Sequence, residues 1–322
     1  MRSRRGIRAA AWVAALALLG YATASAYVWN ELTGVTGDCP RSWLTNDPTA
    51  FEVEHRPTFD TTPYAMPAPQ DVRLASRDPR IEVSGWWIPA AEANAPAVVV
   101  VHGHTACKRD HAVLLPAGML HRNGASVLLI DLRDHGDSSF EDGRFAGGTD
   151  EYLDVLGAWD WLRTEHGMPD ERIGLLGISL GAATVLIAAG EEPAVAAVWE
   201  DSSYADISVA IRAELRRNGY PEFLEAGGVA MARLLTGDDL AGLSPLGGVR
   251  KLDGRPLFVT HGIDDERLSV EYGRELVAAV RSAGGDVEAW FVAGSGHTGA
   301  MVTDPQGYEQ RLVAFFRRTL GG

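Results

Sequence analysis

Short apolar runs that alternate with helical stretches constrain this chain most strongly. Residues 97–101 form a run of one alanine and four valines without polar alternation. Such a run is typical of a strand that is buried on both faces of a sheet. Runs of the same kind recur at 126–131, 172–176, 194–199, 256–260 and 287–292.

Helical patterns separate these runs, at residues 110–123, 149–166, 180–190, 269–283 and 304–320. Parallel strands need crossovers, and crossovers are usually helices. The alternation therefore predicts an α/β fold with a doubly wound, mostly parallel sheet. Residues 72–76 and 81–88, joined by a turn at Asp78-Pro79, predict an antiparallel start to that sheet.

One interval is longer than a crossover needs. About fifty residues separate the strand that ends near Asp201 from the one that begins at Pro256, and they include amphipathic stretches at 209–217 and 221–235. We expect a small helical cap insertion at about 202–250, over the sheet edge where ligands bind in such folds. Its apolar residues either line an acyl pocket or pack the cap onto the sheet: Tyr204, Tyr220, Phe223, Leu224, Met231 and Leu234.

The chain begins with an export or anchoring segment, residues 1–29. Four arginines occur in its first eight residues, and residues 9–29 carry no charge. This pattern predicts either a membrane anchor with the catalytic body outside the cytoplasm, or a signal peptide whose cleavage releases a secreted body. The small residues Ala22-Thr23-Ala24 and Ala24-Ser25-Ala26 fit cleavage. Residues 30–70 are expected to be an irregular linker or lead-in, and 71–322 the main domain.

The charge balance bears on the partners. The chain holds 43 acidic and 29 basic residues, a formal charge of −14, which argues against a nucleic-acid partner. It also favours a neutral small-molecule acyl substrate, although the insertion carries four arginines that would make the entrance basic: Arg212, Arg216, Arg217 and Arg233. The two cysteines, Cys39 and Cys107, either form one disulfide or leave Cys107 as a buried thiol.

The segment Gly177-Ile178-Ser179-Leu180-Gly181 has the pattern Gly-x-Ser-x-Gly. It follows a predicted buried strand and opens a predicted helix, so Ser179 falls on a strand-to-helix turn. Glycines suit that turn because the serine backbone is strained and its neighbours pass closely. We expect Ser179 to be a nucleophile.

A serine nucleophile needs a base, and on such a turn the chain order is serine, acid, histidine. His297, in a glycine-rich turn after the last predicted strand, satisfies the order, whereas His261 is followed rather than preceded by its acids. Asp265 is the expected acid that orients His297. Asp264 and Asp201 are the alternatives.

The oxyanion that forms on attack needs backbone amides from two turns. Leu180, directly after the nucleophile, supplies one, and His104, in the loop His102-Gly103-His104-Thr105, is the choice for the other. Asp110-His111 lies too far along the chain to complete a compact metal site with these histidines. No metal or cofactor is predicted.

These motifs together resemble the α/β-hydrolase superfamily from about residue 70 to the carboxyl terminus. The turn Asp131-Leu132-Arg133-Asp134-His135-Gly136-Asp137-Ser138 is similar to that superfamily's Asp-x-Arg-x-x-Gly-x-Ser turn. Residues 76–89 with Val101-His102-Gly103-His104 are similar to membrane-anchored bacterial hydrolases allied to serine aminopeptidase-like and dienelactone hydrolase-like proteins. The resemblance implies a serine hydrolase that cleaves carboxylic esters through an acyl-enzyme. A serine peptidase with the same triad and a non-catalytic anchored binding module remain alternatives.

Overall fold

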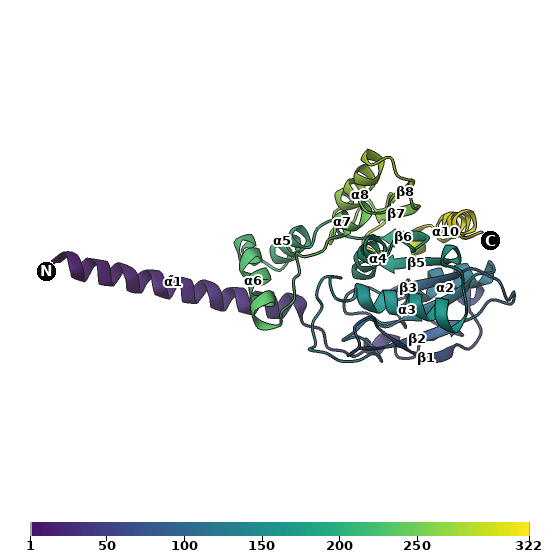
Figure 1. The fold of residues 1–322 in the computed structure, drawn as a ribbon, viewed down its shortest axis with the longest axis horizontal. Coiled ribbons are helices and arrows are strands. Elements are labelled where there is room, and N and C mark those ends of the chain that lie inside the picture. The colour runs from purple at the N-terminus through teal and green to yellow at the C-terminus, as the bar shows by residue number, and fades with distance from the viewer. Residues whose placement is uncertain (1, 322) are drawn as a thin grey trace.

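A single sheet organises the main body. The computed structural model describes residues 2–321, which form an eight-stranded sheet in the order β1-β2-β4-β3-β5-β6-β7-β8 (Figure 1). β1 and β2 are antiparallel and β2 pairs antiparallel with β4, while all later pairings are parallel. The predicted doubly wound α/β fold is confirmed. The strands are β1 (Gln70–Ala75), β2 (Glu82–Ile88), β3 (Ala97–Val101), β4 (Ser126–Ile130), β5 (Ile173–Ile178), β6 (Ala197–Asp201), β7 (Leu257–Gly262) and β8 (Val287–Val292).

Helices cover both faces of the sheet because the central strands bury side chains on both sides. In β3, Val99 and Val101 join a core with α3, α4 and α8, while Val98 and Val100 join a second core with α2 and α10. The unbroken valine run therefore supplies both cores at once. The covering helices are α2 (His111–Arg122), α3 (Tyr152–Glu165), α4 (Leu180–Glu191), α8 (Val270–Ser282), and α10 (Pro305–Leu320), which follows the short α9 (Ala300–Thr303).

The insertion after β6 is helical, as the amphipathic stretches predict. It contains α5 (Ile207–Arg217), the 3₁₀ turn η4 (Glu222–Leu224) and α6 (Glu225–Leu235). The short helix α7 (Pro245–Val249) then packs against α4 and leads back to the sheet. We call residues 207–235 the cap.

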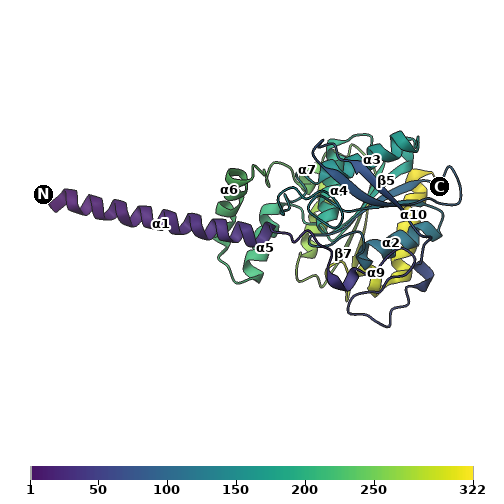
Figure 2. The same ribbon diagram turned by 90° about the horizontal axis from the view of Figure 1, so that it is seen from below.

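The amino-terminal helix is longer than expected and does more than precede the body. α1 runs from Arg2 to Thr33, and its stretch Gly6–Thr33 is long and apolar enough to cross a membrane. Its first half projects from the body, whereas its second half packs against the cap (Figures 1 and 2). The expected lead-in therefore loses its first four residues, 30–33, to the helix.

The rest of the lead-in crosses the body with little regular structure, in two 3₁₀ turns, η1 (Arg41–Trp43) and η2 (Thr62–Tyr64), as expected. Cys39 and Cys107 form a disulfide, with 5.6 Å between their Cα atoms. The bridge joins the segment after α1 to the chain just past the His104 loop. It settles the choice that the sequence left open between a disulfide and a buried thiol.

Candidate active site

Ser179 stands at the sharp turn between β5 and α4. Its backbone has φ +55° and ψ −114°, which is strained for a residue with a side chain. Two residues later, a Cβ on Gly181 would come within 2.4 Å of the carbonyl oxygens of Val101 and His102. Only glycine therefore lets α4 start this close to β3, and the strand–turn–helix context inferred from the sequence is present.

His297 lies between Ser179 and Asp265. Its Nε2 is 2.9 Å from the Ser179 Oγ, and its Nδ1 is 2.8 Å from Asp265 Oδ2. An ionised carboxylate accepts hydrogen bonds but cannot donate them, so Nδ1 carries the hydrogen. Nε2 is then free to accept a hydrogen bond from the serine hydroxyl. The structure thus brings together the three side chains predicted from chain order.

Asp265 is buried, and its carboxylate is surrounded by donors. The Arg267 and Leu268 amides donate to Oδ1 at 2.9 and 2.8 Å, while both His261 and His297 approach Oδ2. Burial alone would raise the pKa of Asp265, but the hydrogen bonds from His261 and His297 and the nearby amides hold that pKa well below its ordinary value. The group is therefore an anion throughout the neutral range.

The two alternative acids have other partners. Asp264 accepts a hydrogen bond from the Gly294 amide at 2.8 Å, as a turn residue does. Asp201 is fully buried and accepts from Ser202 and Tyr308. Neither carboxylate is bonded to His297 within residues 2–321, which favours Asp265.

His261 is a residue of the site that the sequence reasoning missed. Chain order excludes His261 as the base, but the structure gives it another role. In the structure its buried Nε2 lies 2.8 Å from the Leu268 carbonyl and 3.2 Å from Asp265 Oδ2. It therefore fixes the loop that carries the acid. The sequence signal for this role is the position of His261, four residues before Asp265 on the same strand-end turn.

The loop after β3 lies directly over the nucleophile. A Cβ on Gly103 would be 3.3 Å from the Ser179 Cβ, so glycine allows the close approach. In the described chain, the backbone amides of His104 and Leu180 donate to no internal acceptor. Both are therefore available to an oxygen that develops negative charge beside Ser179.

His102 and His104 are neutral in this loop. His102 accepts from the Leu132 amide through Nε2, and its Nδ1 donates to the Gly103 carbonyl at 2.7 Å. Burial lowers the pKa of each imidazole to about 3. His102 thus holds the loop to the turn after β4.

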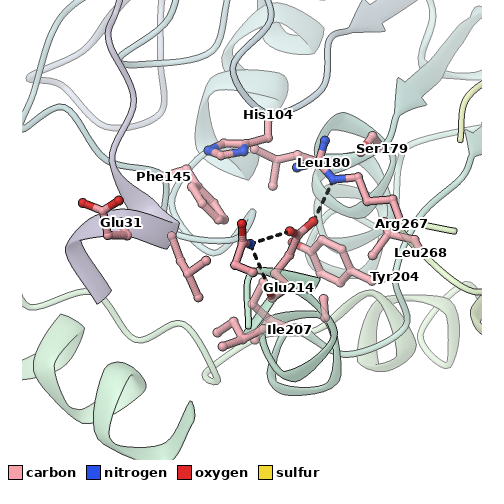
Figure 3. A pocket seen from close by; sticks show the side chains of 14 residues that line it. Glu31, His104, Phe145, Ser179, Leu180, Tyr204, Ile207, Glu214, Arg267 and Leu268 are labelled. Carbon is pink, nitrogen blue, oxygen red and sulfur yellow. Dashed lines mark hydrogen bonds and ion pairs between the residues drawn. The ribbon is translucent and has the colours of Figure 1, made fainter. Parts of the chain in front are cut away.

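Ser179 opens into an apolar cavity of about 190 Å³. Figure 3 shows side chains from four parts of the chain around it: Glu31 from the end of α1, His104 and Phe145 from loops, and Ile207 from the cap. Sequence reasoning did not foresee the contribution of α1. The apolar side chains of the lining are Leu32, Phe145, Leu180, Tyr204, Ile207, Ala210, Ile211 and Leu268.

The expected acyl-pocket residues of the insertion are largely elsewhere. Of the six, only Tyr204 lines the cavity that contains Ser179. Leu224 is buried against α1 and α5, and Tyr220 lies beside α1. Phe223 and Leu234 are 68% and 74% exposed, so they neither line this cavity nor pack onto the sheet, and both alternatives left open by the sequence fail for them. Periodicity identified the apolar residues of the insertion but not the surface that each one faces.

Of the charged groups that line the cavity, Arg267 and Glu214 are paired with each other, whereas Glu31 has no ion-pair partner in the described chain. Arg267 Nε donates to Glu214 Oε1 at 2.8 Å, an ion pair that joins the acid loop to α5 (Figure 3). The four arginines of the insertion also have acidic partners, so they do not form a basic entrance. These pairs are Arg212–Glu225, Arg216–Glu222, Arg217–Glu214 and Arg233–Asp239.

Comparisons with known proteins concern the fold and the family of the chain. A thiohydrolase of Aspergillus aculeatus is 37% identical over 100 residues, which are 30% of each chain. The chain spans less than half the length of the curated relatives it matches. An esterase of Pyrococcus furiosus shares the fold with a TM-score of 0.65 and 22% identity, covering 88% of this chain and 98% of its own.

A second solved structure, acylaminoacyl peptidase of Pyrococcus horikoshii, has a TM-score of 0.58 and 21% identity over 79% of this chain and 42% of its own. At these identities the likeness concerns the fold, which is that of the α/β hydrolases. Residues 117–322 match the prolyl oligopeptidase family. That segment is well over half of the 322 residues. The chain belongs to the prolyl oligopeptidase family of α/β hydrolases.

Proposed function

We propose that this serine hydrolase cleaves carboxylic esters, with Ser179 as its nucleophile. The observation that carries the proposal is the pair of hydrogen bonds that link Asp265, His297 and Ser179 at the floor of an apolar cavity. An apolar cavity stabilises the acyl part of an ester by burial. Arg267 of the lining is paired with Glu214, and Glu31 adds a negative charge at the rim, so neutral esters are favoured over anionic ones.

The geometry supports an acyl-enzyme mechanism. Ser179 Oγ attacks the acyl carbon while its proton moves to His297 Nε2, and the carbonyl oxygen becomes an anion that accepts from the Leu180 and His104 amides. His297 then gives the proton to the departing alkoxide. Water attacks the acyl-enzyme with His297 as base, the acid product leaves, and Ser179 regains its proton. Asp265 keeps the imidazole oriented and stabilises its charged form.

A serine peptidase is the second candidate. Membership of the prolyl oligopeptidase family favours it, and so does one observation on the cavity. Glu31 lies at the cavity rim on the last turn of α1, and Glu214 lines the same cavity. A carboxylate at the rim would attract the ammonium group of an aminoacyl substrate. Glu214 is already bonded to Arg267 and Arg217, which leaves Glu31 as the candidate for that contact.

We also propose that α1 stays attached as a membrane anchor. Ser25 is completely buried, and Val28 and Trp29 pack into the cap and the loop at Ala146. Cleavage after Ala24 or Ala26 would cut α1 at a point where the residues before it and the residues after it both contact the cap. Four arginines before the apolar segment favour a cytoplasmic amino terminus and an extracytoplasmic body.

The nucleophile is tested by Ser179→Ala. We expect turnover of short p-nitrophenyl esters to fall by a factor on the order of 10⁴ or more, with loss of labelling by a fluorophosphonate. Stoichiometric labelling of the wild type also distinguishes an enzyme from a binding module. Undiminished labelling of the folded variant would remove Ser179 from this role.

Ester and amide cleavage are separated by a substrate panel. Acyl esters, aminoacyl amides and peptidyl amides are compared with the wild type and with Glu31→Gln. An esterase should show negligible amide turnover, and the variant should leave ester turnover nearly unchanged. Efficient cleavage of aminoacyl amides that is lost in Glu31→Gln would instead establish the peptidase.

A further inference from the structure

The cap carries an exposed apolar stripe that the catalytic site does not use. Phe223, Ala226, Ala230 and Leu234 are all exposed, and in helical spacing they fall within one narrow arc. No charged residue lies between them on that arc. We call these four residues the cap stripe. It lies on η4 and α6, whose other side packs on α1 and α5.

The position of α6 in the molecule determines which way the cap stripe faces. Figures 1 and 2 show α6 as the outermost element of the body on the side from which the first half of α1 projects. α6 runs across α1 rather than along it in both views. If α1 spans a bilayer, α6 therefore lies along the bilayer surface. No other element of the described chain separates α6 from the bilayer.

The packing of α1 on α6 fixes this arrangement. A Cβ on Gly227 would clash with Ser25, at 2.0 Å from its Oγ, so the glycine brings the two helices into close contact. The Tyr21 hydroxyl donates to the Phe223 carbonyl at 3.1 Å, and the two rings stack with centroids 6.2 Å apart. Phe223 thus lies at the same level along α1 as Tyr21.

The length of α1 gives the depth of that level. A hydrocarbon core of about 30 Å takes about 20 helical residues. Counted from Gly6, where the apolar helix begins, the core ends near Ser25; counted from Ala9, directly after Arg8, it ends near Val28. Tyr21 lies four to seven residues before these limits. At 1.5 Å per residue, Phe223 is then about 6–10 Å inside the hydrocarbon boundary.

The surroundings of the stripe have the character of a bilayer boundary. Two separate aromatic pairs, Tyr21 with Phe223 and Tyr27 with Tyr220, supply three amphipathic tyrosine rings between α1 and the cap. Arg216 and Arg233, with side chains 68% and 73% exposed, are paired with Glu222 and Asp239, and these exposed ion pairs place polar groups beside the apolar stripe, as at a headgroup level. A groove of about 700 Å³ between α1 and the cap is lined mainly by apolar side chains, among them Leu16, Leu19 and Leu224.

We propose that the cap is seated in the lipid bilayer, with Phe223, Ala226, Ala230 and Leu234 inserted into the leaflet at the carboxyl end of α1. This inference rests on the proposed anchoring of α1. An interfacial helix buries its apolar face about 5–10 Å into the headgroup and acyl boundary, which matches the depth obtained from α1. The stripe is exposed in the structure because its partner is lipid.

The experiment measures depth directly and needs no catalysis. Cysteine is introduced singly as Phe223→Cys, Leu234→Cys, Leu16→Cys or Glu171→Cys in the full chain with Ser179→Ala. Since Cys39 and Cys107 are joined, each variant has one free thiol for an environment-sensitive nitrobenzoxadiazole dye. The protein is reconstituted in phosphatidylcholine vesicles. Quenching by acyl-chain nitroxide lipids is compared with quenching by aqueous iodide.

We expect the dyes at 223 and 234 to be blue-shifted, quenched by nitroxide lipid and shielded from iodide, like the dye at 16. The dye at exposed Glu171, on η3 (Asp170–Arg172), should show the reverse. Quenching at 16 but not at 223 and 234 would overturn the seated cap while leaving the anchor intact. Shielding from iodide without lipid quenching would mean that protein covers the stripe, which also overturns it. Absence of quenching at 16 would overturn the anchor and the inference together.

Discussion

At the scale of single residues, the candidate site depends on which of two adjacent aspartates faces His297. Asp265 does so because the turn after β7 directs it inward, where His261 and two amides hold it, while Asp264 bonds the Gly294 amide. Chain order and turn position favoured these two aspartates over Asp201, with Asp265 as the choice and Asp264 as the alternative. They were not enough to find His261, because its role is to contact the acid rather than the serine.

The choice between the aspartates has a matched test. Asp265→Asn should lower kcat for a short ester on the order of 10⁴-fold, since the amide no longer favours the imidazole tautomer with hydrogen on Nδ1. Asp264→Asn, one residue away, should leave kcat within a few-fold of the wild type. Steady-state kinetics on both folded variants check this. Equal losses would contradict the assignment of Asp265 as the orienting acid.

A second residue-scale prediction concerns the buried Glu200 on β6. Burial raises its pKa to about 8 from 4.5, and its Oε1 has no hydrogen-bond partner in the described chain. Between these two values the folded state holds a proton that the unfolded state has lost, so stability falls as pH rises. The residue alone contributes a slope of about 1.4 kcal/mol per pH unit.

Glu200→Gln should remove this slope. We expect the free energy of unfolding of the wild type to fall more steeply than that of the variant between pH 5 and pH 8, so that the variant is the more stable of the two at pH 8. Urea unfolding at a series of pH values measures the difference. Parallel pH profiles for the two proteins would show that Glu200 does not titrate in this range.

At the scale of elements, the strands and main helices follow from the sequence because their patterns are local. The buried valine run of β3 and the amphipathic helices need no knowledge of partners to be recognised. The cap differs, since its apolar residues face three surfaces: the cavity, α1, and the outside. An amphipathic period shows only that a face is apolar, so it could not predict which of these surfaces Phe223 faces.

Because Ile211 of α5 lines the cavity, we expect this helix to influence which acyl chains fit. Ile211→Ala should enlarge the cavity and shift the preference toward longer acyl chains. Two further buried methylenes correspond to roughly tenfold in kcat/KM at about 0.8 kcal/mol each. Val209→Ala on the same helix, and Phe223→Ala outside the cavity, serve as controls with unchanged profiles. A p-nitrophenyl ester series in detergent measures all three, and a shift in the controls alone would contradict this expectation.

At the scale of the whole molecule, the sequence predicted a membrane anchor or signal peptide, then a linker, then a separate catalytic body. The structure joins these parts, because α1 extends to Thr33 and contributes Glu31 and Leu32 to the cavity that contains Ser179. Hydropathy could not show this, since an apolar helix gives the same pattern whether lipid or protein covers it. The disulfide from Cys39 to Cys107 then holds the segment after α1 near the His104 loop.

The contacts between α1 and the catalytic body predict different outcomes for two truncations. A chain that lacks residues 1–29 loses Ser25, Val28 and Trp29, which bury against the cap, whereas a chain that lacks residues 1–20 keeps them. The shorter chain should show faster amide hydrogen exchange in α5 and α6 and lower kcat/KM for short esters. Exchange in β3, β5 and β7 should be the same in both, because the sheet packs independently of α1. Equal protection of α5 and α6 in the two chains would mean that the cap holds its shape without α1, and the helix would then be an anchor alone.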